Sequence, residues 1–136
     1  MNPNDELKAL SAYRFEQSLE CLRSAKILAE CGDYRGAANR SYYAFFHAMR
    51  SVFALDNQDF SKHSGVASNF RKDFIKSGIF EVKFSDMIKS AFYIRNNSDY
   101  DDFYVIVKAD VEEQIQNAEE FCAAVRTYLE GKKVTL

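Results

Sequence analysis

A single proline, at position 3, is the feature that most constrains what this sequence can fold into. Proline is the residue that most strongly interrupts helices and central strands, and none follows it. Only 5 of the 136 residues are glycine, fewer than the turns of a β-sandwich or barrel require. We therefore expect an all-α fold, and the length fits one domain that spans residues 1–136.

Apolar residues recur at helical spacing in five stretches of the sequence. The expected helices cover residues 4–30, 34–55, 64–76, 84–97 and 109–130. Asp33 is the expected N-cap of the second helix, whose predicted core face consists of Ala38, Tyr42, Phe45, Met49 and Val52. Residues 96–102 form a polar stretch, and residues 103–107 are expected to complete a tight connection to the last helix. The pattern predicts an up-and-down four-helix bundle with one additional short helix.

The charge balance limits the kinds of partner that the whole chain can attract. With 18 basic and 20 acidic residues the formal charge is −2, so any contact with nucleic acid needs a local basic patch. The longest wholly apolar run, residues 42–46, is far too short to span a bilayer. The polar N-terminus is unlike a secretory signal, and we expect a cytoplasmic protein without a membrane partner.

The cysteines and histidines do not form a recognisable metal-binding pattern. Cys21, Cys31 and Cys122 lack zinc-ligand spacing, and we expect all three to be small buried side chains in a reducing compartment. The two histidines are far apart and without matching ligands. Because phosphate-binding and dinucleotide-binding glycine motifs are also absent, we expect neither a metal nor a cofactor.

The second expected helix carries another distinctive face, beside its core stripe. Asn39, Tyr43, Phe46, His47 and Arg50 share this face. Aromatic rings interleaved with arginine and histidine suit a dimer interface or a surface on which bases stack. Alternatively, the two aromatic rings pack on a neighbouring helix.

Arg95 falls within the apolar stripe of the fourth expected helix, close to Phe84 in projection. An arginine in that position needs a partner, and Asp99 at i+4 lies on the same side, with Tyr100 next. The pair can close the bundle, or it can hold a cationic site for a phosphate. His63 begins the third helix, where backbone N–H groups attract anions, although a histidine there can also be an ordinary surface residue.

Three motifs, in order along nearly the whole chain, resemble those of the HEPN domain. They are Asn39-Arg40-Ser41-Tyr42-Tyr43-Ala44, then Lys62-His63-Ser64-Gly65, then Arg95 with Asp99-Tyr100. The resemblance implies a helical bundle that usually homodimerises. It also implies a metal-independent ribonuclease toxin or the partner of a minimal nucleotidyltransferase encoded beside it.

In the family's ribonucleases an arginine stabilises phosphate charge, and a histidine separated from it by four to six residues is the acid or base. Arg95-Asn96 matches the start of that motif, but Tyr100 stands where the histidine is expected. The catalytic candidates, if the protein is an enzyme, are Arg95, Asp99 and Tyr100. The expected ligand-binding set is Arg95, Asn96, Asp99, Tyr100, Asn39, Tyr43 and His63, and the expected dimer interface is Tyr43, Phe46, His47 and Arg50.

These observations favour one function and leave two alternatives open. The favoured function is binding of RNA or a nucleotide within a toxin–antitoxin or defence-type module, with a nucleotidyltransferase partner and a degenerate ribonuclease motif. The first alternative is a non-catalytic homodimeric interaction module. The second is an active metal-independent endoribonuclease toxin.

Overall fold

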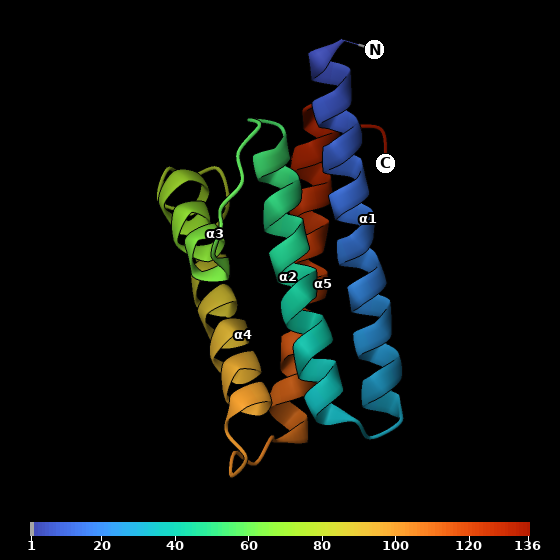
Figure 1. The fold of residues 1–136 in the computed structure, drawn as a ribbon, viewed down its shortest axis with the longest axis vertical. Helices are drawn as coiled ribbons and strands as arrows, with labels where there is room; N and C mark the ends of the chain where they lie inside the picture. Colours follow the sequence, from blue (N-terminus) through green and yellow to red (C-terminus); the bar gives the residue numbers. More distant parts are fainter. Residues whose placement is uncertain (1) are drawn as a thin grey trace.

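The computed structural model describes residues 2–136, and within them it contains five α-helices and no strand. The helices are α1 (Pro3–Glu30), α2 (Tyr34–Ala54), α3 (His63–Phe70), α4 (Lys83–Tyr100) and α5 (Lys108–Gly131). The four long helices alternate in direction, and the short α3 lies beside the start of α4 (Figure 1). The prediction of an all-α, up-and-down bundle with one extra short helix is confirmed.

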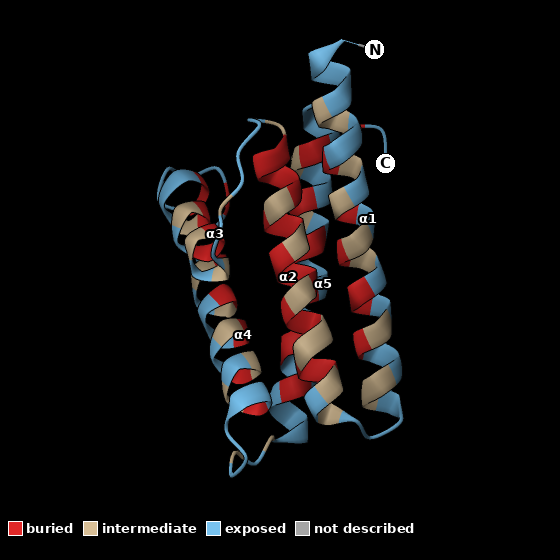
Figure 2. Cartoon of the chain, viewed as in Figure 1, coloured by how far each residue is buried: buried red, intermediate tan, exposed pale blue. Residues whose placement is uncertain are grey.

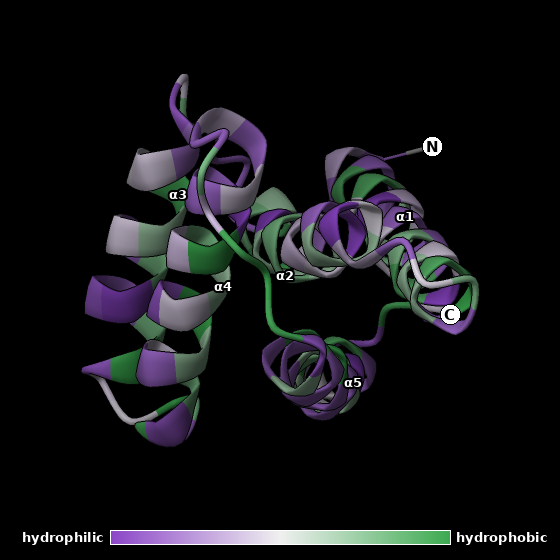
Figure 3. Ribbon diagram, turned by 90° about the horizontal axis from the view of Figure 1, so that it is seen from below, coloured by the Kyte–Doolittle hydropathy of each residue, from purple (hydrophilic) through white to green (hydrophobic). Residues whose placement is uncertain are grey.

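Helix α2 is the central element, because it packs against α1, α4 and α5 (Figure 3). Small side chains let α1 approach it closely. The Ser18 hydroxyl donates to the Ala44 carbonyl at 2.7 Å, and the Ser11 hydroxyl donates to the Ser51 carbonyl at the same distance. Both serines are fully buried, and these bonds satisfy their polar groups inside the α1–α2 interface.

Phenylalanine rings fill the space between α2, α3, α4 and α5. Phe121 lies at their centre, with its ring centroid 5.3 Å from those of Phe45 and Phe84 and 5.5 Å from that of Phe70. The predicted core face of α2 is buried throughout, at Ala38, Tyr42, Phe45, Met49 and Val52 (Figure 2). Contacts between aromatic rings in offset or edge-to-face geometry therefore do the packing that leucine provides in many bundles.

The turn between α1 and α2 follows from three residues. Gly32 has a φ of +83°, a conformation that other residues adopt at a cost, and it lets the Asp33 N–H donate to the Leu28 carbonyl at 2.8 Å. Asp33 then caps α2 as predicted, since its carboxylate accepts a hydrogen bond from the Gly36 N–H at 2.9 Å. The antiparallel α1–α2 pair is thus fixed at its closed end.

The third and fourth helices differ from the sequence-based boundaries. Helix α3 starts at His63 and is followed by a wider turn, η1 (Arg71–Ile75), in which the Lys76 N–H donates to the Arg71 carbonyl at 2.8 Å. Helix α4 continues to Tyr100, so its predicted end at residue 97 is three residues too early, and part of the polar stretch 96–102 is helical. Side chains of α2 bind the last turn of α4, as described below, and keep it helical.

One cysteine prediction is also wrong. Cys21 and Cys122 are buried, but Cys31 is exposed because it occupies the C-cap of α1, at the edge of the bundle. The connection 103–107 contains no strand, as expected. Among the described residues, no helix combines the length and the apolar character needed to cross a membrane.

Candidate functional site

Arg95 lies on α4 and points toward α2, where its side chain is 13% exposed. Its Nε lies 3.1 Å from Oδ2 of Asp99, one helical turn later, which confirms the predicted proximity of the two residues. This Nε makes no well-aligned hydrogen bond, so the contact with Asp99 is chiefly electrostatic. A guanidinium that is this deeply buried requires such a counter-charge.

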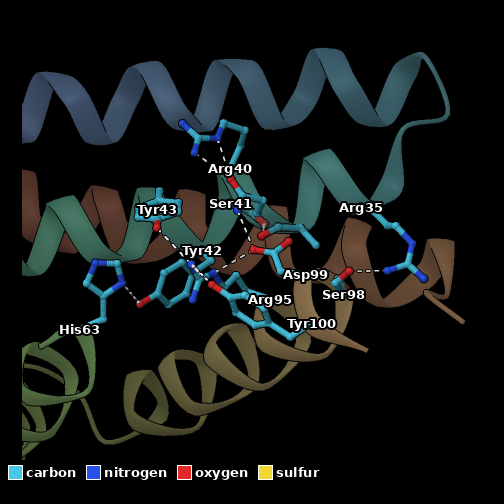
Figure 4. Close-up of polar contacts among 12 residues, drawn as sticks. Arg35, Arg40, Ser41, Tyr42, Tyr43, His63, Arg95, Ser98, Asp99 and Tyr100 are labelled. Atoms are coloured by element: carbon cyan, nitrogen blue, oxygen red, sulfur yellow. Dashed lines mark hydrogen bonds and ion pairs between the residues drawn. The ribbon is translucent and has the colours of Figure 1, made fainter. Parts of the chain in front are cut away.

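Three tyrosine rings surround the Arg95 guanidinium (Figure 4). Its central carbon lies 5.1 Å from the ring centroid of Tyr42, 5.6 Å from that of Tyr43 and 5.4 Å from that of Tyr100. Nη2 donates to the hydroxyls of Tyr43 at 3.2 Å and Tyr100 at 3.4 Å. Nη1 has no hydrogen-bond acceptor among residues 2–136. The rings orient the cation and leave one face of its donor fork available.

A chain of polar contacts joins this cation to a second one on α2. Asp99 Oδ2 accepts from Asn39 Nδ2 at 3.0 Å, and Asn39 Oδ1 accepts from Arg40 Nε at 3.0 Å and Nη2 at 2.7 Å. The Arg40 guanidinium lies 5.0 Å from the Tyr43 ring centroid. Asn39 thus spaces two arginines that flank one tyrosine, and we name Asn39, Arg40, Tyr43, Arg95, Asp99 and Tyr100 the arginine–tyrosine site.

His63 borders this site from α3. Its Nδ1 lies 3.3 Å from the Tyr42 hydroxyl, and its ring centroid is 5.7 Å from that of Tyr43. Burial, followed by the charges of Arg95 and Arg50, lowers the pKa of His63. Burial raises the pKa of Tyr42 to about 12 despite the opposing charge of Arg95, so that hydroxyl keeps its proton. The neutral imidazole of His63 therefore lies near Arg95. It comes from α3, whereas the histidine of the family motif is replaced by Tyr100 on α4.

The second face of α2 is less exposed than a free interface would be. Phe46 is only 7% exposed, because it packs within the monomer against His63, with ring centroids 4.2 Å apart and the rings tilted by 40°. The alternative, in which this ring packs on a neighbouring helix, is the one observed for Phe46. Arg50 lies 3.0 Å from Asp59, a carboxylate that also lies 3.5 Å from Arg14. The charges of Arg14, Arg40 and Arg50 act on His47, and those of Arg50 and Arg95 act on His63, so cations surround both histidines.

Of the residues expected to bind a ligand, the structure brings together Asn39, Tyr43, His63, Arg95, Asp99 and Tyr100. Asn96 is exposed, and its side chain forms no hydrogen bond with these residues. Sequence reasoning missed Arg40 as a member of the site and missed Arg35 as its support. Arg35 donates to the carbonyls of Ser98 and Tyr104, and it fixes the end of α4 that carries Asp99.

A signal for Arg35 existed in the sequence. It occupies the first turn of α2, where the positive end of the helix dipole disfavours a cation. An arginine at such a position needs carbonyl or carboxylate partners from elsewhere, and here α4 and its following loop supply them.

His47 gives the site a measurable pH dependence. Burial, and then the charges of Arg50 and Arg40, lower its pKa to about 4 from an ordinary value of 6.5. Protonation therefore favours the unfolded chain, so stability is complete above pH 6.5 and falls as the pH approaches 4.

We expect the free energy of unfolding to drop between pH 7 and pH 4.5 by about 1–2 kcal/mol more in the wild type than in His47→Gln, allowing for partial exposure of the ring. Urea denaturation at the two pH values measures this difference. Identical pH dependence of the two proteins would show that His47 titrates normally.

The comparisons with known proteins agree with this architecture. A profile of the HEPN domain matches residues 11–128, which include every residue of the arginine–tyrosine site. A UPF0332 protein of Thermotoga maritima is 30% identical over 130 residues, 96% of this chain and 98% of its own. Two proteins of Methanocaldococcus jannaschii are named "Putative toxin". The first is 28% identical over 88% of this chain and 81% of its own length. The second is 34% identical over 71% of this chain and 69% of its own length. The match over most of the bundle shows that the chain belongs to the HEPN-domain family.

Proposed function

We propose that this protein binds RNA or a nucleotide at the arginine–tyrosine site, as a component of a toxin–antitoxin or defence-type module. The observation that carries the proposal is the Arg95 guanidinium, which tyrosine rings and Asp99 hold in one orientation with Nη1 free of protein acceptors. Arginine held in this way suits a phosphate, since its planar fork matches two phosphate oxygens.

The surroundings of Arg95 supply two further features of single-stranded RNA recognition. Tyr100 is 71% exposed and offers an aromatic face on which a base can stack. Arg40, beside Tyr43, provides a second cation along the path of a phosphate backbone.

The proposed setting extends to protein partners. The relatives named "Putative toxin" support a toxin-type role, and the family resemblance supports a homodimer with a nucleotidyltransferase as its second component. The face of α2 that we assign to the dimer includes the half-buried Tyr43, His47 and Arg50. Phe46 is buried under this face and supports it from within the monomer.

We expect the tagged protein to co-purify with a nucleotidyltransferase encoded beside its gene, and light scattering of the protein alone to give the mass of a dimer. Each component expressed without the other provides the control. Purification of this chain alone from the co-expressing strain would contradict the partnership, and a monomer mass would contradict the dimer.

The binding proposal predicts a loss of affinity when the cation is removed. Arg95→Ala should weaken binding of a single-stranded oligoribonucleotide by about tenfold, because a charged hydrogen-bond donor to phosphate is lost. Arg95→Lys should recover only part of the affinity, since an ammonium cannot reproduce the planar fork. Fluorescence anisotropy at two salt concentrations measures both effects.

Arg23→Ala is the matched control, because Arg23 is an exposed arginine of α1 that pairs with Glu16 at 3.2 Å, outside the site. Thermal melting establishes that each variant is folded. Equal affinities of Arg95→Ala and Arg23→Ala would rule out the arginine–tyrosine site as the RNA contact and leave a non-catalytic interaction module as the better account.

A second candidate function is metal-independent RNA cleavage, and the position of His63 favours it. Transesterification needs a base that takes the proton of the 2′-hydroxyl while its oxygen attacks phosphorus, and an acid that protonates the departing 5′-oxygen. The neutral imidazole of His63 would take the 2′-hydroxyl proton, and the imidazolium so formed would return it to the departing 5′-oxygen, so the proton balance closes on this residue. Arg95 beside it would supply a cation for the developing negative charge on the phosphate.

Under this candidate, wild-type protein cleaves mixed RNA in the presence of EDTA, whereas His63→Gln and Arg95→Ala lose at least about a hundredfold in rate. Arg23→Ala again retains the wild-type rate. Gel analysis of 5′-labelled RNA measures the rates. If all four proteins share the same background, the ribonuclease candidate is wrong and the binding role stands alone.

A further inference from the structure

A cavity distinct from the arginine–tyrosine site lies between α4 and α5. It encloses about 260 Å³, and its walls include Tyr93 of α4, Tyr104 of the following loop, and Asp110, Glu113 and Gln114 of α5. No arginine, lysine or histidine lines it. The chemistry of this cavity is therefore opposite to that of the arginine–tyrosine site.

Gln114 contributes a buried acceptor without a partner. Gln114 is only 4% exposed, and its Oε1 has no hydrogen-bond partner among residues 2–136. The orientation of the amide is fixed, because Nε2 donates to the Ala38 carbonyl at 3.0 Å and to the Ser41 hydroxyl oxygen at 2.6 Å. The Ser41 proton is itself engaged with backbone carbonyls of α2. Since α2 holds the nitrogen, the oxygen is the one amide atom left without a hydrogen-bond partner, in a residue that lines the cavity.

The two carboxylates of the cavity are also without cationic partners. Neither Asp110 nor Glu113 forms an ion pair within the described chain, whereas the adjacent Glu112 pairs with Lys108 at 3.6 Å. Tyr93, Tyr104 and Asp110 line the same cavity, and burial, followed by the charges of Asp110 and Tyr93, raises the pKa of Tyr104. Arg35 holds the Tyr104 carbonyl and so fixes that wall.

A buried carbonyl oxygen, two carboxylates and two tyrosine rings are the groups that recognise an organic cation. An ammonium group donates several hydrogen bonds and is attracted to carboxylates and to aromatic faces. A buried acceptor that stays unpaired costs free energy, so a donor in the cavity gains from supplying it. We propose that the α4–α5 cavity binds a small organic cation, a protonated alkylamine, with its ammonium group at Gln114 Oε1 and the carboxylates of Asp110 and Glu113.

Titration with butylammonium chloride, followed by two-dimensional NMR at constant ionic strength, tests this site. We expect saturable shifts at Tyr93, Tyr104 and Gln114, and no saturable shifts there with 1-butanol, which has the same chain without the charge. Glu113→Gln should weaken binding about three- to fivefold, the effect of one exposed carboxylate. Glu112→Gln, one residue away and outside the cavity, should leave the affinity unchanged.

Three outcomes would overturn the proposal. The first is equal chemical-shift changes with butanol and butylammonium. The second is wild-type affinity for butylammonium in the Asp110→Asn, Glu113→Gln double variant. The third is saturable binding of the lysine side chain in acetyl-Gly-Lys-Gly-amide but not of butylammonium. The last result would assign the cavity to a peptide partner rather than to a small molecule. Because these variants leave the Gln114 amide in place, they test the site without removing a buried hydrogen-bond network.

Discussion

The ion pair between Arg95 and Asp99 is the constraint on which the rest of the site depends. Burying a guanidinium costs several kcal/mol of hydration, and a carboxylate within 3.1 Å together with three tyrosine rings offsets that cost. Asp99 fulfils this role only if α4 remains helical to its last turn. The ion pair, the length of α4 and its docking onto α2 through Asn39 are therefore parts of one arrangement.

Helix α4 separates two surfaces of opposite charge. On the side facing α2, arginines outnumber carboxylates, and tyrosines order the cations. On the side facing α5, carboxylates and the Gln114 carbonyl line a cavity without a cation. A protein of net charge −2 can thus present a local cationic site, because the net charge does not fix how charges are distributed over the surface. Arg35 supports both sides, since it holds the end of α4 and the loop residue Tyr104.

Much of the fold could be predicted from the sequence, because local physics decides it. The absence of proline after position 3, the 3.6-residue periodicity and the Asp33 cap predicted the helices and the core face of α2 correctly. The end of α4 could not be predicted in this way. Its residues are polar and typical of a loop, and only contacts from α2, 60 or more residues away, make them helical.

The same distinction applies to the candidate site. The i, i+4 spacing of Arg95 and Asp99 lies within one helix, and the sequence predicted their proximity. The approach of His63 to Tyr42 and the burial of Phe46 depend on how α3 folds back onto α2, which no local pattern specifies. No local pattern distinguishes Gln114 from the other polar residues of α5, because its oxygen is left unpaired only by the hydrogen bonds that its nitrogen makes to α2.

The most direct test of the account is to observe the arginine side chains during titration with a short single-stranded oligoribonucleotide. The side-chain Nε–Hε resonances of Arg95 and Arg40 report the two cations of the site, and that of Arg23 reports an unrelated surface. The account predicts that the resonances of Arg95 and Arg40 shift and saturate together while that of Arg23 stays in place. Saturable shifts elsewhere, with those of Arg95 and Arg40 unchanged, would contradict it.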